Sequence, residues 1–178
     1  MRILSFDISA SPGVALLEIK GGAPKLLAVD HLETSADLTD AQRFDLIQAF
    51  VTDFIYRHGY DNIDAIVREK FIKGGSKRGT QLVFGAWASV DRALATYGYK
   101  VDEANEIVAS RVKKYIGGKG GAKKDEVAAG VIRILGETSK QCFYTDKGRL
   151  LDDRSDATAI GLAYAIQHGL IKPEGSDQ

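Results

Sequence analysis

The sequence predicts an α/β fold in which helices cover a mixed β-sheet. Three consecutive strand patterns open the chain, and alternating helix and strand patterns follow them. The length of 178 residues is that of one domain, and a hydrophobic share of 44% with a charged share of 27% is typical of a globular protein. We expect a single domain over residues 1–172 and a disordered tail over 173–178. The pattern excludes a helical bundle and an all-β barrel.

The first three strands are predicted from short apolar runs separated by turn signals. Residues 2–8 are nearly all apolar, and Ser11-Pro12-Gly13 is a turn signal before a second strand at 14–19. Gly21-Gly22 predicts a hairpin into a third strand at 25–29. We therefore expect an antiparallel meander.

The following segments alternate between helical and strand patterns. Thr39 and Gln42 have the spacing of a capping box, and apolar residues at helical spacing continue to Gly59, which suits a left-handed helix end. The other elements that we expect are strands at 65–69 and 100–104, and helices at 80–97, 105–115, 123–135 and 153–168.

The distribution of charge is more informative than its sum. The chain has 24 basic and 24 acidic residues, which argues against strong nonspecific DNA binding by the chain as a whole. Acids gather in residues 30–64, so we expect a positive and a negative side. Two basic clusters favour nucleic-acid contact and solvated loops about equally. They are Arg111, Lys113, Lys114, Lys119, Lys123 and Lys124, and Arg68, Lys70, Lys73, Lys77 and Arg78.

Four carboxylates are the candidates for chemistry. Asp7 lies in the most apolar strand, where a charge is costly unless a metal or another cation pairs with it. Glu69 ends a second buried strand. Asp153 and Asp156, spaced i, i+3 at the start of an apolar helix, share one helical face. No His or Cys cluster competes with them, so the set suits hard cations such as Mg²⁺ or Mn²⁺.

Each acid also has a purely structural interpretation. Asp153 and Asp156 can be first-turn acids of a helix. Glu69 can pair with the arginine before it, and Asp7 can form a buried ion pair with a lysine. Asp152 also has helical spacing to Asp156, so the choice between Asp152 and Asp153 as a ligand stays open. The combination of acids, more than any one of them, favours a functional site.

The order of these residues resembles the RuvC family of Holliday junction resolvases. Asp7 precedes the hairpin, Glu69 ends a strand, and the segment Asp-Arg-Ser-Asp-Ala-Thr-Ala-Ile-Gly-Leu-Ala at 153–163 is similar to the family's D-x-x-D-A-x-A helix. The basic, glycine-rich segment 111–127 is similar to another family stretch, with its two lysines at Lys113 and Lys124. The resemblance spans nearly the whole chain. It implies an RNase H-like fold with a five-stranded mixed sheet.

The resemblance also implies an activity. A homodimeric crossover junction endodeoxyribonuclease would resolve four-way DNA junctions by paired nicks in recombination and repair. Two Mg²⁺ ions per active site, replaceable by Mn²⁺, would be held by Asp7, Glu69, Asp153 and Asp156. Lys124 would complete the catalytic set by stabilising charge on the scissile phosphate. The DNA contacts that we expect are Lys113, Lys114, Lys119, Lys123, Arg111, Lys73, Lys77, Arg78 and Phe71.

Three features depart from the family's pattern. The family's aromatic wedge falls three residues after the glutamate, where this chain has Ile72, and Phe71 is one place early. The segment 138–151 is longer than usual, and the sequence ends without a basic tail. These departures bear on junction selectivity more than on nuclease chemistry. The brevity of the chain and the missing tail would suit a phage-encoded relative.

Other function classes were weighed against this one. A phosphotransferase of the actin and sugar-kinase type also begins with strand, Asp and hairpin, but it needs two such domains. A non-catalytic junction-binding protein gains nothing from acids that face phosphates, whereas a nuclease for flaps or three-way branches stays open. The segment 117–124 lacks the Ser or Thr of a Walker A motif, so we expect no nucleotide cofactor.

Location and assembly are predicted from apolar patterns. The apolar start is too short and interrupted for a signal peptide or membrane span, so we expect no membrane contact and a cytoplasmic location. A homodimer is expected through the helix at 80–97, although the same helix can simply cover the sheet. The features that favour a partner are small residues (Gly85, Ala86, Ala88, Ser89) and an apolar stripe (Val83, Ala86, Trp87, Leu94).

Overall fold

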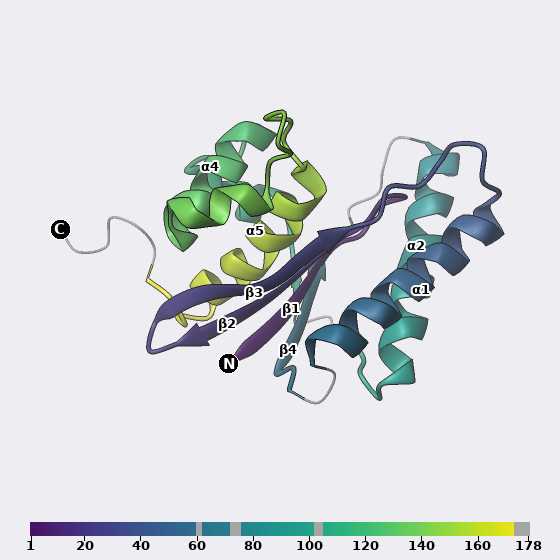
Figure 1. Ribbon diagram of the computed structural model, residues 1–178, viewed down its shortest axis with the longest axis horizontal. Helices are drawn as coiled ribbons and strands as arrows, with labels where there is room; N and C mark the ends of the chain where they lie inside the picture. The colour runs from purple at the N-terminus through teal and green to yellow at the C-terminus, as the bar shows by residue number, and fades with distance from the viewer. Residues whose placement is uncertain (60–61, 72–75, 102–104, 173–178) are drawn as a thin grey trace.

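A mixed five-stranded sheet with helices on both faces forms the fold (Figure 1). The computed structural model describes residues 1–59, 62–71, 76–101 and 105–172. Its strands are β1 (Arg2–Asp7), β2 (Gly13–Lys20), β3 (Ala23–His31), β4 (Ala65–Glu69) and β5 (Glu106–Ile107). The spatial order is β3-β2-β1-β4-β5, with β1, β2 and β3 antiparallel and β4 parallel to both β1 and β5. The predicted fold class is confirmed.

The helices divide into two layers. They are α1 (Asp40–His58), α2 (Lys77–Thr96), α3 (Ala109–Gly117), α4 (Lys124–Leu135) and α5 (Asp152–Gln167), with a short 3₁₀ helix η2 (Glu137–Cys142). Figure 1 shows α1 and α2 on one side of the sheet and α4 and α5 on the other. Two apolar cores result, one between the sheet and each helical layer. None of the helices in the described ranges is long and apolar enough to cross a membrane.

The predicted boundaries of α1 are confirmed. The hydroxyl of Thr39 accepts a hydrogen bond from the Gln42 backbone at 3.3 Å, and the Gln42 side chain accepts one from the Thr39 backbone at 3.0 Å. Gly59 ends the helix with φ 108°, in the left-handed region that a residue without Cβ adopts freely. Local capping therefore fixes both ends of this helix.

The strand expected at 100–104 is wrong at residues 100–101, and the helix start expected at 105 is also wrong. The first two residues of that range form no strand, and 102–104 lie outside the described residues. The strand is Glu106–Ile107, because the backbone of Lys70 donates to Ile107 O at 2.8 Å and Arg68 pairs with Glu106 at 2.9 Å. This pairing along β4 overrides the helical pattern, so α3 starts only at Ala109. The expected tail at 173–178 also lies outside the described residues.

Three of the four small residues of α2, Gly85, Ala86 and Ser89, pack on the same chain, whereas Ala88 is exposed. A Cβ on Gly85 would lie 2.0 Å from the ring of Phe44 on α1, so this glycine permits the close contact between the two helices. Ala86 and Leu94, which were expected to face a partner, are fully buried in the core. The predicted dimer stripe is therefore wrong at these two positions, whereas Trp87 is partly exposed.

Helix α5 lies directly on the backbone of β1 and β2. The hydroxyl of Ser5 in β1 donates to the Ala157 carbonyl at 2.7 Å, and both groups are buried. A Cβ on Gly161 would lie 2.6 Å from Leu17 Cδ1 and 2.7 Å from Ser5 Oγ. Nearly every residue of α5 after its first turn is buried. These contacts fix the distance between α5 and the sheet.

Gly161→Ala tests this contact. The added methyl has no space beside Leu17 and Ser5, so we expect a loss of about 1–3 kcal/mol in the free energy of unfolding. Gly121→Ala is the control, because a Cβ there meets no atom within 4 Å. Urea denaturation of both variants measures the difference. Equal stability of the two variants would contradict the close packing of α5.

Candidate active site

Two of the predicted carboxylates lie at the same edge of the sheet. Asp7 is the last residue of β1, and Glu69 is the last residue of β4. These strands are parallel neighbours, with Phe6 paired to Arg68, so their carboxyl ends meet at one edge. The sequence folds this way because each strand has a buried, mainly apolar stretch before the partly exposed end that carries its acid.

The first turn of α5 brings the other two carboxylates to this edge. Gly13 is the residue of β2 that pairs with Asp7, and a Cβ on it would lie 1.9 Å from the Asp153 carbonyl oxygen. Only glycine allows the helix backbone to lie so close to the strand. Asp153 and Asp156 therefore start the helix beside the strand end that carries Asp7.

The acids act on one another electrostatically. Burial is the largest cause that raises the pKa of Asp7 to about 8, and the charges of Asp156, Glu69 and Asp153 contribute to the same shift in that order. Burial also raises the pKa of Asp156 to about 6, against the lowering effect of Lys124. The pKa of Glu69 and that of Asp153 are raised as well, in both cases chiefly by burial. Perturbation of this kind is typical of functional sites.

Lys124, the first residue of α4, forms an ion pair with Asp152. Its Nζ also lies 3.9 Å from Asp156. The hydrogen bond to Asp152 raises the pKa of Lys124, and the same bond lowers the pKa of Asp152. Asp152 is thus neutralised by the lysine, whereas Asp153 is not paired with a cation by any described contact within 4 Å.

Two hollows adjoin the acids. A small cavity of about 180 Å³ has Glu69, Asp156, Lys113 and Lys124 in its wall. A second, of about 370 Å³, is lined by Asp7 and Glu69 and by aromatic residues beside them. Glu69 belongs to both walls. The carboxylates and the two lysines therefore border space that a phosphate group can reach.

The four acids offer the type of ligand atom that hard cations prefer. Their side chains are not, however, arranged around one point as they would be with a bound ion. Asp7, Glu69, Asp153 and Asp156 offer only carboxylate oxygens, which Mg²⁺ and Mn²⁺ prefer. Burial and the neighbouring acids raise the pKa of Asp7, so a cation held at this edge would stabilise its charged form. Within the described ranges, however, no three His, Cys, Asp or Glu side chains form a group able to hold an ion. The residues fit a divalent cation in kind and location.

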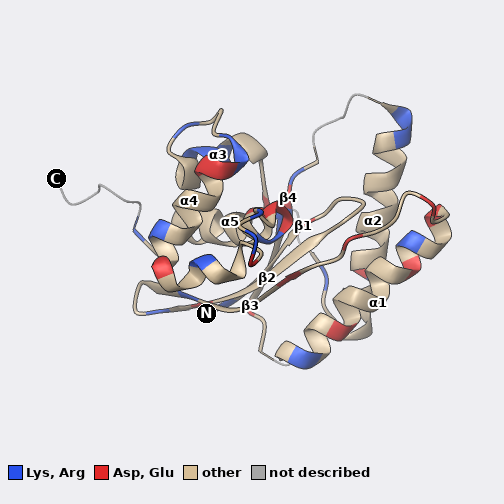
Figure 2. Ribbon diagram, turned by 45° about the horizontal axis from the view of Figure 1, so that its top comes forward, with Lys and Arg blue, Asp and Glu red and all other residues tan. Residues whose placement is uncertain are grey.

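The predicted DNA contacts are distributed around this edge. Figure 2 shows basic residues on α3 and at the first turn of α2. Lys113 and Lys114 are exposed on α3, and Lys113 is close enough to lower the pKa of Glu69. Others are engaged in ion pairs or hydrogen bonds, namely Lys119 with Glu126, Arg78 with Asp40, and Arg111 with Gln167. Lys123 and Lys77 are exposed, and Lys73 lies outside the described residues.

Phe71 belongs to an aromatic cluster that the sequence did not predict. Its ring centroid lies 5.0 Å from that of Phe84 and 6.2 Å from that of Trp87. The guanidinium of Arg68 covers the Trp87 ring at 3.9 Å. Phe84 is 51% exposed, an unusual fraction for phenylalanine, and this exposure could not be deduced from helical spacing alone.

Comparisons with known proteins agree with this arrangement. No protein-family model matches the chain. The crossover junction endodeoxyribonuclease RuvC of Pseudomonas entomophila (strain L48) is 28% identical over 140 residues, which cover 75% of this chain and 68% of the relative. The likeness to RuvC that was identified from sequence motifs is confirmed.

Two solved structures share the fold. The Thermus thermophilus RuvC structure superposes with a TM-score of 0.72 at 23% identity, covering 97% of this chain and 99% of that one. The structure of T. thermophilus RuvC in complex with a Holliday junction substrate has a TM-score of 0.73 at 21% identity, with the same coverage. RuvC has the RNase H-like fold that the sequence predicted.

Asp7→Asn tests the electrostatics of the metal-free protein. The pKa of Asp7 is about 8 in the folded protein and near 4 when unfolded, so its contribution to stability is present below pH 4 and is lost as pH rises through 8. Asparagine does not ionise. In EDTA, we expect the melting temperature of Asp7→Asn to exceed the wild-type value by several degrees at pH 9 and by little at pH 4.

Asp146→Asn, an exposed loop substitution, is the control for this comparison. Its melting temperature should follow that of the wild type at both pH values. A constant difference between Asp7→Asn and wild type from pH 4 to 9 would show that Asp7 is not protonated in the folded, metal-free protein.

Proposed function

We propose that this chain is a divalent-metal-dependent endonuclease that resolves four-way DNA junctions by paired nicks. The observation that carries the proposal is the position of Asp7, Glu69, Asp153 and Asp156 at one edge of the sheet in a RuvC-like fold. A binding protein would gain nothing from such a cluster, because carboxylates repel the phosphates of DNA.

The comparisons support this class of substrate. The relative from P. entomophila is named a crossover junction endodeoxyribonuclease, and one similar structure holds a Holliday junction substrate. A nuclease that cuts flaps or three-way branches would use the same catalytic residues. We favour the four-way junction because both named proteins are RuvC.

The residues that would hold the metal are Asp7, Glu69, Asp153 and Asp156, with Mg²⁺ as the ion and Mn²⁺ as its substitute. Two such ions supply the activation of water and the stabilisation of the leaving oxygen in phosphodiester hydrolysis. Asp7, on the innermost strand, has the central position. Asp153 is a better ligand than Asp152, because Lys124 already neutralises Asp152 and because Asp7 responds to the charge of Asp153.

The basic residues have separate tasks in this proposal. Lys124 borders the same small cavity as Glu69 and Asp156, where its ammonium group can stabilise charge that develops on the scissile phosphate. Lys113 and the exposed Lys114 lie on α3 and hold the DNA backbone without reading its sequence. Symmetric nicking also requires a homodimer, in which two sites face opposed strands.

Asp7→Asn also tests the catalytic assignment. It removes a metal ligand but no cation that contacts phosphate, so we expect no detectable Mg²⁺-dependent cleavage of a labelled four-way junction. Junction affinity, measured by gel shift in Ca²⁺, should remain within about threefold of wild type, less than the tenfold step that 1.4 kcal/mol represents. Cleavage by the pure variant at a wild-type rate would remove Asp7 from the site.

Lys124→Ala and Lys114→Ala form a matched pair that separates chemistry from binding. We expect Lys124→Ala to lower the single-turnover rate about 100-fold with little change in affinity, because a preformed cation is lost from the transition state. Lys114→Ala should weaken binding and reduce the slope of log Kd against log salt by about 0.9, the value for one phosphate contact. If both variants lost affinity alone, Lys124 would be a backbone contact.

A further inference from the structure

An arginine, Arg154, lies between Asp153 and Asp156 in the sequence of α5. The helix begins Asp152-Asp153-Arg154-Ser155-Asp156, so a cation occupies the first helical turn. The N-terminus of a helix carries partial positive charge, which disfavours a cation there. Arg154 therefore costs stability at this position unless its side chain is paired elsewhere.

The side chain of Arg154 reaches the end of β3. Its Nη2 donates to Asp30 Oδ1 at 2.9 Å, and its Nε donates to His31 Nδ1 at 2.9 Å. Nη1 donates to the Cys142 carbonyl at 3.4 Å. The side chain of Arg154 is 25% exposed, so most of it is shielded from solvent. One residue thus joins α5, the edge strand β3 and the end of η2.

The segment 137–151 completes this connection. Ser139 and Phe143 anchor it in the core, and Tyr144 forms a bridge with Leu150 that closes it as a loop. The Leu151 backbone then donates to the Phe143 carbonyl at 2.8 Å immediately before α5. The segment that is longer than usual for the family is therefore folded against the start of α5.

The start of α5 has no cap of its own. Leu151 at the N-cap position makes no side-chain cap hydrogen bond. The first turn of the helix is consequently held by tertiary contacts, namely the close approach at Gly13 and the three donor contacts of Arg154. Gly13 limits how near the turn can come to β2, whereas Arg154 limits its movement along the sheet towards β3.

We propose that Arg154, braced by Asp30, His31 and the carbonyl group of Cys142, is a positioning residue that fixes Asp153 and Asp156 for metal binding. This inference rests on the proposed function, since it concerns the same site. Groups that orient metal ligands typically change metal affinity or activity by about 10- to 100-fold when removed. The brace acts through helix position and touches no substrate.

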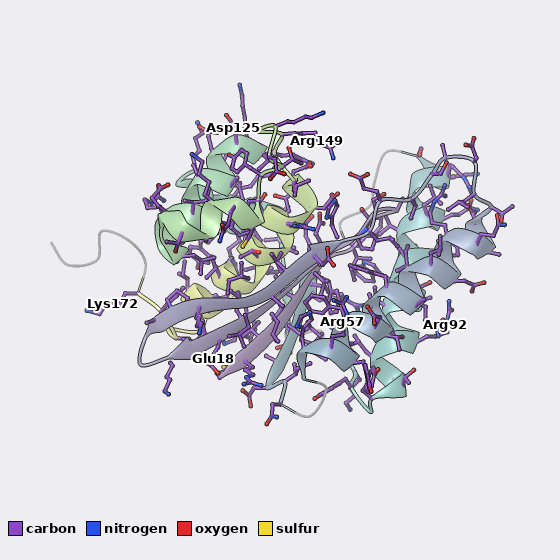
Figure 3. All side chains as sticks on the ribbon, viewed as in Figure 1. Glu18, Arg57, Arg92, Asp125, Arg149 and Lys172 are labelled. Atoms are coloured by element: carbon purple, nitrogen blue, oxygen red, sulfur yellow. The ribbon has the colours of Figure 1, made fainter. Side chains whose placement is uncertain are left out.

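Arg149 provides a matched control in the same segment. It pairs with Glu33 at 3.0 Å, and both side chains are 67% exposed. Figure 3 shows Arg149 at the outer rim of the layer formed by α4 and α5. A solvent-exposed pair of this kind contributes little. Arg149→Gln therefore removes the same chemical group from a neighbouring position without releasing α5.

The experiment is calorimetric titration of the metal-free protein with Mn²⁺, combined with single-turnover cleavage of a four-way junction. We expect Arg154→Gln to weaken Mn²⁺ binding and slow cleavage by about tenfold or more, with junction affinity in Ca²⁺ unchanged. Arg149→Gln should match wild type. Arg154→Lys, which keeps the charge but not the fork, should restore part of the Mn²⁺ affinity.

Asp30→Asn guards against a simple folding defect. It removes the carboxylate from the other end of the brace and should also weaken Mn²⁺ binding, and the double variant should lose less than the sum of the single losses. The proposed role of Arg154 would be contradicted if Arg154→Gln bound Mn²⁺ as tightly as the wild type does. It would also be contradicted if the wild type bound no Mn²⁺. Tight Mn²⁺ binding by wild type without any DNA cleavage would refute the proposed function and leave the brace intact.

Discussion

The contact between α5 and the backbone of β1 and β2 is the constraint on which the site depends. Gly13 and Gly161 lack the side chains that would separate helix from sheet, and Ser5 donates to the helix backbone between them. A side chain at Gly13 would push away the turn that carries Asp153. Because β1 ends and β2 begins at the edge that carries these acids, the packing of the core and the placement of the acids depend on the same contacts. Stability and function are therefore coupled in this region.

The consequence is a set of carboxylates gathered where burial raises their pKa values. Asp7, with a pKa of about 8, carries the largest share of this cost. The ammonium of Lys124, which is paired with Asp152, lowers the pKa of Asp7 by less than any one of the three neighbouring acids raises it. Repulsion among these carboxylates destabilises the fold, and a bound cation would remove that repulsion. Strain of this kind is expected at a functional site and is hard to explain by stability alone.

Much of this arrangement could be predicted because the signals are local. The capping box at Thr39, the glycine at 59 and the apolar strands need only their neighbours in sequence. The strand at Glu106–Ile107 was not predicted, because its pairing with β4 depends on residues about 40 positions away in the sequence. The inner face of α2 was misjudged because only the structure shows that Phe44 faces Gly85. The brace at Arg154 could have been suspected, since an arginine in an acidic first turn needs a tertiary partner.

Anomalous diffraction from crystals soaked in Mn²⁺ tests the central claim most directly. We expect anomalous peaks between the carboxylates of Asp7, Glu69, Asp153 and Asp156, at oxygen distances suited to a small divalent ion of about 2.0–2.4 Å. Asp152 should stay with Lys124. Mn²⁺ at Asp152 alone, or absence of anomalous density at the end of β1 in fully soaked crystals, would contradict the account.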